Sequence, residues 1–540
     1  MKISTLDIQE DKTWSADVCI MGAGVAGITL ANEFAQKGLT VCILDAGGEA
    51  FDENIQRQAK ADKISVPYPD ASHSRLRMLG GTSNHWANNT SPLSPIDFEK
   101  RDGLPNSGWP ISFSDLSDYY EKAAVYCGTG SDGYDLETWH KRFKISPTIS
   151  PLNTGNLKLN IAKAAVPPTR FYKEHGKNLD LSKETTLITF AQVTDLEFNE
   201  FTGKINRAKI TSPGGRIHKV EAAEFIMAFG GLENARMLIH FNNNNKNKLG
   251  NSLDNVGRYF MDHPTLRAAH VYTKEPSLFT MFKGEMTPDY KRFVLNFFEL
   301  GEGVLKEKEL TNLRLPLDKA NRQQLSHGVS SFHLLKEKMS GKNISGDLAS
   351  HLTNLVMDFD VVADTISRKA WNKPVFDSVD DFAGFQVPLM MEQTAHRDNQ
   401  VYLSNKKDRY GIPKLSIKWQ VHQDDKDRLW RGLDVFSSEL GALGLGRVRS
   451  LKDRESRLFD DQIGFGHHHM GTTRMSETSE KGVVDQEQRV FGVKNLSVAG
   501  CSVFATGGHV PPTLTIVATS IRLAEIVSKR INPGARKYEA

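Results

Sequence analysis

Three consecutive histidines, His467 to His469 in "GHHHMGTTRM", form the densest group of ionisable side chains in the chain. Imidazoles bind metal ions, accept protons near neutral pH, or pack in a core. Neighbouring residues of an extended segment face opposite sides, so only His467 and His469 could bind one ion from the same face. No second group of ligands with zinc-like spacing stands nearby. The sequence therefore predicts no metal, and leaves proton transfer and packing open.

A second stretch with chemical meaning is "CIMGAGVAGITLANEFAQKGLTVCILDAGG". Gly22, Gly24 and Gly27 fit the pattern GxGxxG between an apolar run and a helical pattern, and a second apolar run ends at Asp45. Gly22 permits a tight turn, Gly24 lets the backbone approach a pyrophosphate, and Gly27 lets helix and strand pack closely. The helix N-terminus attracts the anion, and Asp45 can accept hydrogen bonds from a ribose hydroxyl. The stretch predicts a bound adenine dinucleotide.

Composition limits the remaining possibilities. The chain has 540 residues, which is long for one compact domain, and its net charge of +3 does not favour a nucleic-acid partner. Its four cysteines do not form a disulfide framework, which favours a reducing compartment. We find no secretory signal core and no apolar run long enough for a membrane span. A cytoplasmic location is the expectation.

Several segments together resemble the glucose–methanol–choline (GMC) oxidoreductases, and more narrowly their branch that is similar to pyranose oxidases and bacterial sugar dehydrogenases. These segments are "LGGTSNHW", "GWPISFSDLSDYY", "EFIMAFGGLENARMLI", "NVGRYFMDHP", "MEQTAHRDNQVYLS", "HHHMGTTRM", "GVVDQEQRVFGVKNLSVAGCSVF" and "PPTLTIVATSIRLAEIV". They run in the family's order from about Asp17 to Val527. The resemblance therefore covers nearly the whole chain.

The resemblance implies an α/β fold with two domains. A Rossmann-type FAD-binding domain would be built from residues 1–264 and 448–540, and a substrate-binding domain of sheet and helices from 265–447. FAD is the expected dinucleotide, because "DAGG" at Asp45 to Gly48 also resembles flavin enzymes. Within 265–447, an apolar stripe at steps of three and four residues predicts one face of a helix, which we interpret as core packing. It consists of Leu348, Leu352, Leu355, Phe359, Val362 and Ile366.

By the same resemblance, two further segments would hold the flavin. The loop "LGGTSNHW" would lie over its ring system, and "AGCSVF" and the start of the last helix would approach it from elsewhere. The flavin-binding residues implied are Gly80, Gly81, Asn84, His85, Gly500, Cys501, Pro512 and Thr513. In pyranose oxidases a histidine at the position of His85 carries the flavin covalently. For His85 a covalent bond and a simple hydrogen bond both remain open.

The resemblance also assigns the middle histidine. His468 stands three residues before Gly471 in the family's H-x-x-G-T pattern, which implies a general base that takes the substrate's hydroxyl proton. The family's second catalytic residue, an Asn or His, is replaced here by Pro511, which has no side-chain donor or acceptor. His509, two positions upstream, is the candidate substitute. A water or another residue is the alternative.

These observations predict an FAD-dependent oxidoreductase that oxidises the CH–OH group of a small-molecule alcohol, a sugar, glycoside or other metabolite. Oxygen, a quinone or a redox protein would accept the electrons, and the sequence does not decide among them. The alternative is a lyase of the hydroxynitrile-lyase kind, in which FAD serves only the structure, and the replacement at Pro511 keeps that alternative open. A biosynthetic enzyme acting on a non-sugar metabolite would use the same oxidation chemistry.

Overall fold

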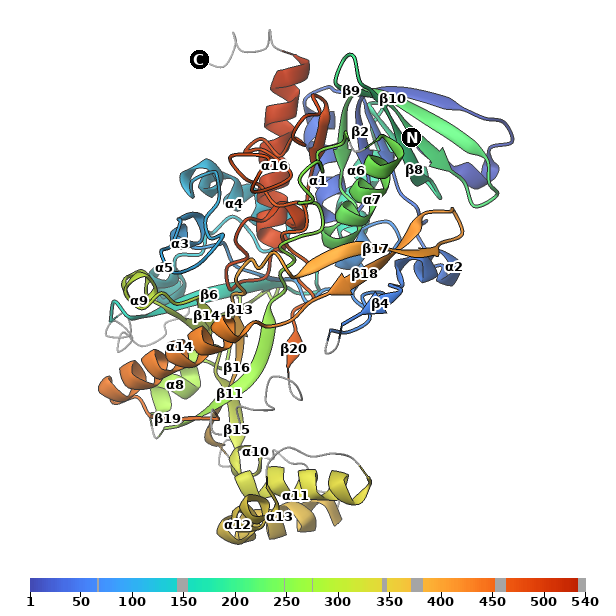
Figure 1. Cartoon of the computed structure of the whole chain (residues 1–540). Helices are drawn as coiled ribbons and strands as arrows, with labels where there is room; N and C mark the ends of the chain where they lie inside the picture. The colour runs from blue at the N-terminus through green and yellow to red at the C-terminus, as the bar shows by residue number, and fades with distance from the viewer. Residues whose placement is uncertain are drawn as a thin grey trace.

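A computed structural model of the chain describes residues 1–65, 68–142, 154–246, 248–273, 275–341, 347–370, 382–451 and 463–532. Helices and strands are mixed throughout, which confirms the expected α/β class (Figure 1). The four sheets described below supply most of the framework. In the described part of the chain, no helix is both long enough and apolar enough to cross a bilayer.

The largest sheet contains the predicted strand–helix–strand unit. Its strand order is β1 (Lys2–Ser4), β7 (Thr185–Thr189), β3 (Val41–Leu44), β2 (Thr13–Met21), β10 (Ile217–Met227), β9 (Lys204–Thr211) and β8 (Gln192–Asn199), with β21 (Leu496–Val498) also paired to β10. Strands β1 to β10 in this order are parallel, whereas β9 and β8 are antiparallel. Parallel strands buried on both faces explain the continuous apolar runs of β2 and β3.

Segments from both ends of the chain meet beside this sheet. Helix α1 (Val25–Gln36) contacts α16 (Thr513–Ile531), and α16 in turn contacts α4 (Ser114–Tyr126). Figure 1 shows the red C-terminal helix lying beside the blue N-terminal elements. Helices that are far apart in the sequence therefore pack together beside the parallel sheet.

Two further sheets lie below the first in Figure 1. One has the order β14 (Leu313–Arg314), β16 (Phe382–Met391), β11 (Pro264–Tyr272) and β19 (Arg447–Ser450), with β15 (Asp318–Asn321) on β16 and β20 (Gly464–Phe465) on β11. The other joins β12 (Glu285–Met286), β13 (Arg292–Leu300), β6 (Leu157–Ala165) and β5 (Asn89–Thr90). Helix α14 (Gln423–Ala442) packs its apolar face into their shared hydrophobic core. A small fourth sheet contains β17 (Gln400–Lys407), β18 (Pro413–Lys418) and β4 (Lys63–Ile64).

The buried apolar residues divide into two large clusters. One surrounds the parallel sheet, and the other fills the space between α14 and the antiparallel sheets. Residues 448–450 belong to β19 of the antiparallel sheet, close to the predicted change of domain. The boundaries 1–264, 265–447 and 448–540 stay predictions.

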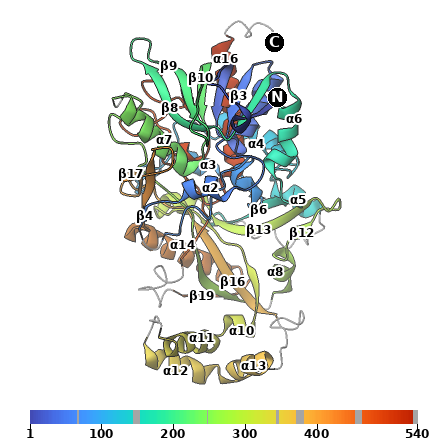
Figure 2. The same ribbon diagram turned by 90° about the vertical axis from the view of Figure 1, so that its right-hand side faces the viewer.

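A helical arm extends from the second sheet. It contains α10 (Arg322–Leu325), α11 (His327–Met339), α12 (Leu348–Met357) and α13 (Phe359–Ala370), and Figures 1 and 2 show it standing apart from the rest of the molecule. Because only α11 and α10 pack against α12 and α13, one side of the arm has no cover within the described chain. The arm therefore carries apolar side chains that are exposed.

The apolar stripe predicted to pack in a core lies on this arm, and that prediction is wrong for most of it. Leu348 and Leu352 are 51% exposed, Phe359 is 73% and Ile366 is 47% exposed. Val362 is buried and Leu355 is partly buried against the arm's own small core. The stripe is also split between two helices at Asp358. Periodicity predicts an amphipathic face, but it does not reveal whether that face has a partner.

Candidate active site

One cavity of about 780 Å³ runs from the parallel sheet to the second sheet. It connects the glycine-rich turn after β2 with the loop before α16 and with the histidine segment. Ten of the fourteen residues predicted to bind the cofactor or act on the substrate line this cavity, and the other four, Gly27, Gly80, Asn84 and His509, do not. The ten are Gly22, Gly24, Asp45, Gly81, His85, Gly500, Cys501, Pro512, Thr513 and His468.

The glycine-rich turn has the geometry that a dinucleotide requires. At Gly22, φ is +114°, and a Cβ there would lie 2.5 Å from the carbonyl oxygen of Ala228. At Gly27 a Cβ would lie 1.9 Å from the carbonyl oxygen of Gly22, so only glycine lets α1 pack on the turn. A Cβ on Gly24 would meet no atom within 4 Å and would stand in the space that the turn leaves open. This space at the start of α1 suits a pyrophosphate.

Asp45 follows β3 and lines the same end of the cavity. Its carboxylate accepts hydrogen bonds from the N–H groups of Ala23 at 2.9 Å and Gly47 at 2.8 Å. Burial raises the pKa of the Asp45 carboxyl, while these two N–H groups favour the charged form. Each carboxylate oxygen keeps a second lone pair. Asp45 is therefore held in place by the backbone and can still accept a hydrogen bond from a ribose hydroxyl.

The loop that precedes β5 places His85 on the cavity wall. Gly80 has a φ of +84° and Asn84 donates from Nδ2 to the carbonyl oxygens of Leu79 and Gly81, so these two residues shape the loop. Burial lowers the pKa of His85, which favours the neutral imidazole. Whether His85 forms a covalent bond to the flavin stays a prediction.

The opposite wall comes from the C-terminal part of the chain. Gly500 and Cys501 line the cavity where β21 ends, and Pro512 and Thr513 line it at the start of α16. Pro512 is the N-cap of α16, and no side chain caps the N–H groups of the first turn. Such a helix N-terminus stabilises negative charge. Pro511, which replaces the expected Asn, also lines the cavity.

His468 pairs with a histidine from another part of the chain. His263 Nδ1 lies 2.8 Å from His468 Nδ1, and His263 Nε2 lies 2.9 Å from the carbonyl oxygen of Gly508. A carbonyl oxygen only accepts, so His263 carries its proton on Nε2. Burial lowers the pKa of His263 to about 4, so its Nδ1 is unprotonated at neutral pH.

This pairing fixes the protonation of His468. Its Nδ1 must donate to the lone pair on His263 Nδ1. Burial, and then the neighbouring His263, lower the pKa of His468 well below its ordinary value, so the ring is neutral. The lone pair is consequently on Nε2. A neutral imidazole with an open Nε2 on a cavity wall is able to accept a proton.

Asp262 holds the two histidine segments together. Its Oδ1 accepts from the backbone N–H groups of His263 and His468, both at 2.7 Å. Its Oδ2 accepts from the hydroxyl of Tyr68, also at 2.7 Å. The carboxylate is fully buried and has three donors. Asp262, which lies just before β11, therefore fixes the position of the His468 backbone, although the two residues are 206 positions apart in the sequence.

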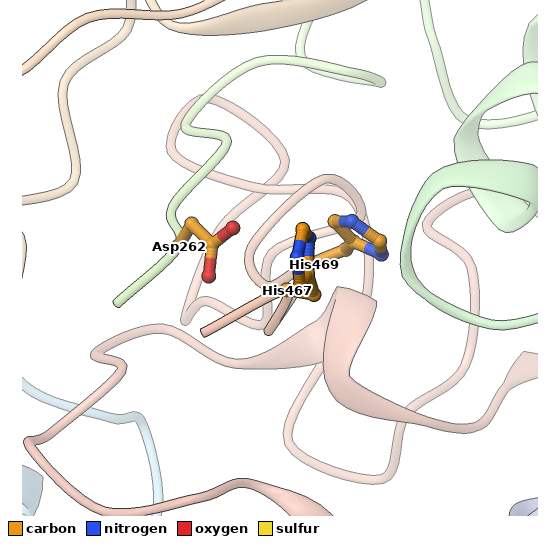
Figure 3. Close-up of side chains that lie close together, drawn as sticks. All are labelled: Asp262, His467 and His469. Atoms are coloured by element: carbon orange, nitrogen blue, oxygen red, sulfur yellow. The ribbon is translucent and has the colours of Figure 1, made fainter. Parts of the chain in front are cut away.

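Asp262 also lies beside the other two histidines, as Figure 3 shows. Potential metal-binding atoms of Asp262, His467 and His469 lie within 4.8 Å of one another. Three hydrogen bonds already satisfy the Asp262 carboxylate without a metal ion. His469 Nε2 lies 3.4 Å from the hydroxyl of Ser74. The absence of a metal here stays a prediction. His467 also lines the cavity.

His509 is not brought to the cavity. It is fully buried, and its Nε2 lies 2.8 Å from Glu299 Oε2 on β13. Burial alone would lower the pKa of His509, but the hydrogen bond to Glu299 and nearby carboxylates raise it. In this structure the histidine that pairs with His468 is His263, not His509. A catalytic role for His509 stays a prediction that its position does not support.

Asp262 and His263 are site residues that were not predicted from the sequence, although a signal was present. Both stand in "NVGRYFMDHP", a segment that carries the family resemblance. An acid and a histidine next to each other before a proline could have been examined as site residues. Their pairing with His468 was not visible, because 205 residues separate the two histidines.

Several known proteins are similar to this chain. Residues 395–520, which include all three consecutive histidines, match the family model of the GMC oxidoreductases. The chain therefore contains the C-terminal domain of a GMC oxidoreductase. It is 22% identical to the fructose dehydrogenase large subunit of Gluconobacter japonicus, over 97% of this chain and 100% of that protein. It is also 22% identical to the 2-methyl-1,2-propanediol dehydrogenase of Mycolicibacterium austroafricanum, over 96% of each chain.

A solved structure of similar fold is pyridoxine 4-oxidase from Mesorbium loti, with a TM-score of 0.54 and 14% identity over 94% of this chain and 98% of that one. GMC oxidoreductases bind FAD, so the expected cofactor is confirmed. The residues present fit it. Gly24 leaves open space at the start of α1, Asp45 is poised at the same end, and one continuous cavity leads to His85 and His468.

Proposed function

We propose that this GMC oxidoreductase oxidises the CH–OH group of a small alcohol, with His468 as the general base. The observation that carries the proposal is the hydrogen bond between the two Nδ1 atoms of His263 and His468. It favours an unprotonated Nε2 on the wall of the FAD cavity. When bound, FAD supplies the acceptor for the two electrons and the hydrogen that leave the carbinol carbon.

Residues of the chain itself remove the hydroxyl proton of the substrate and hold the base in position. As the alcohol becomes a carbonyl, its O–H bond breaks and the proton moves to Nε2 of His468. The charge that forms on the imidazole ring is stabilised through Nδ1–H by His263, which is oriented in turn by Gly508. Asp262 fixes the backbone of both histidines, so the base does not have to be reoriented during the reaction.

Burial of His468 supports this role at neutral pH. Its pKa is lowered well below the ordinary value, so the ring is ready to accept a proton at pH 7. The reductive step should therefore keep its rate as pH falls from 8 to 6, and slow only when the pH approaches the lowered pKa. Sugars, glycosides and other alcohol metabolites remain the proposed substrate class.

Anaerobic addition of alcohols to the purified yellow protein tests the proposal. A substrate should bleach the flavin absorbance, and its carbonyl product should appear in equal amount. Admission of oxygen, a quinone or a redox protein then identifies the electron acceptor by the return of the yellow colour. The lyase alternative predicts cleavage of a cyanohydrin with the flavin absorbance unchanged, and that result would replace the oxidation proposal.

A further inference from the structure

Three arginines line the cavity, and their partners differ. Arg75 and Arg77 form ion pairs with Glu233 at 3.1 Å and 3.0 Å. Arg314, on β14 of the second sheet, lies within 4 Å of no carboxylate in the described part of the chain. It lines the cavity together with Gly466 and His468. The region near His468 therefore contains a cation without an anion.

The surroundings of Arg314 do not compensate its charge. The residue is only 7% exposed. One hydrogen bond joins its Nη2 to Asn89 Oδ1 at 3.3 Å, and its Nε has no hydrogen-bond partner among the described residues. The guanidinium lies 4.7 Å from the ring centre of Phe297. Burial lowers the pKa of Arg314 to about 10, which still leaves it charged at neutral pH. A buried charge without a partner is unfavourable unless a ligand supplies one.

Two neighbouring side chains add donors at the same place. Because Asn89 Oδ1 accepts from Arg314, the amide N–H groups of Asn89 face elsewhere, and they donate to no described residue. Thr265, at the start of β11, also lines the cavity, and its side chain carries a hydroxyl. A guanidinium, an amide N–H group and a hydroxyl together suit an oxyanion, which a guanidinium binds through two parallel hydrogen bonds.

We propose that Arg314 binds a carboxylate or phosphate group of the substrate, so that this enzyme takes alcohols that carry an acidic group. The inference rests on the proposed function, because it names the substrate class of the same cavity. Asp45 and Glu233 are the acidic residues on the cavity wall, and Glu233 is already paired with arginines. Asp45 and Glu233 are therefore the only acidic residues of the described cavity wall that could repel an anion bound to Arg314.

The same arrangement couples substrate binding to the base. The positive charge of Arg314 is one of the influences that lower the pKa of His468. An anion bound to Arg314 offsets that charge and makes His468 a stronger base. An acidic substrate should therefore shift the lower limb of the pH–rate profile upward relative to a neutral alcohol.

Binding of unreactive anions to the FAD-loaded enzyme tests the site. Inorganic phosphate and acetate represent the two sources of an oxyanion, and each is titrated while the visible spectrum of the bound FAD is recorded. Wild type should bind at least one of them, and Arg314→Met, which keeps a long side chain without the charge, should bind it at least tenfold more weakly. Arg322→Met, on the exposed arm, is the matched control for lost charge and should bind as wild type does.

The outcomes separate this inference from the proposed function. Equal anion binding by wild type and Arg314→Met, or no anion binding at all, overturns the inference even when alcohols bleach the flavin. Loss of FAD from Arg314→Met also overturns it, because the arginine would then bind the cofactor. Anion binding that depends on Arg314 without bleaching by any alcohol supports the anion site and counts against the oxidation proposal.

Discussion

Replacement of His263 by phenylalanine should slow flavin reduction without loss of FAD. The change removes both nitrogen contacts of His263, to His468 at 2.8 Å and to Gly508 at 2.9 Å, while a flat aromatic ring is kept. His468 Nδ1–H would then have no acceptor, and the proton would be favoured on Nε2, where the substrate needs a lone pair. An unsatisfied buried group costs about 1–3 kcal/mol.

That free energy converts directly to a rate. Each 1.4 kcal/mol corresponds to about a factor of ten, so His263→Phe should slow reduction roughly 10- to 100-fold. His263→Asn is the matched variant, because its side-chain oxygen can stand where Nδ1 was and accept from His468. The assay is anaerobic stopped-flow reduction of the bound FAD at saturating substrate. Most of the rate should return in His263→Asn.

Two results would refute this reasoning. Reduction of His263→Phe at the wild-type rate would mean that His263 does not set the proton position on His468. Equal loss in His263→Phe and His263→Asn would mean that only the shape of the imidazole matters.

Three further predictions concern the cofactor and a buried acid. Gly24→Ala should leave the melting temperature of the apoprotein unchanged but weaken FAD binding, whereas Gly27→Ala should prevent folding, since its Cβ meets a backbone oxygen at 1.9 Å. Acid precipitation should release yellow flavin into the supernatant, and flavin retained in the pellet would establish a bond at His85. Burial raises the pKa of Asp425 to about 7, so its carboxylate destabilises the fold progressively as pH rises toward 7. Asp425→Asn should therefore gain stability relative to wild type between pH 5.5 and 8, on the order of 2 kcal/mol by chemical denaturation.

The glycine-rich turn could be predicted from the sequence, because its residues are close together in the chain. The positions of Gly22, Gly24 and Gly27 depend on one turn and one helix, so their spacing alone carries the geometry. The loop that contains His85 is likewise a single short segment. FAD and the α/β class are confirmed by the comparisons and the fold.

The substrate half could not be predicted in the same way. The contact between His263 and His468 joins two segments through tertiary structure, and neither segment alone reveals it. His509 matched a gap in the family pattern at Pro511, yet it lies buried against Glu299. The stripe that includes Leu352 and Phe359 has the period of a packed helix, but its outer side has no cover within the described chain. The spacing of residues in the sequence indicates local geometry, whereas the residues that a side chain contacts across the molecule depend on the tertiary fold.

The most direct test of the central claim is the rate of anaerobic flavin reduction in His468→Ala, with His467→Ala as the control. Loss of a general base slows its step by roughly 10²- to 10⁴-fold, so His468→Ala should hold FAD normally and reduce it that much more slowly. His467 is exposed and forms no hydrogen bond with a described residue, so His467→Ala should remain close to wild type. Reduction of His468→Ala at the wild-type rate would contradict the assignment of the base.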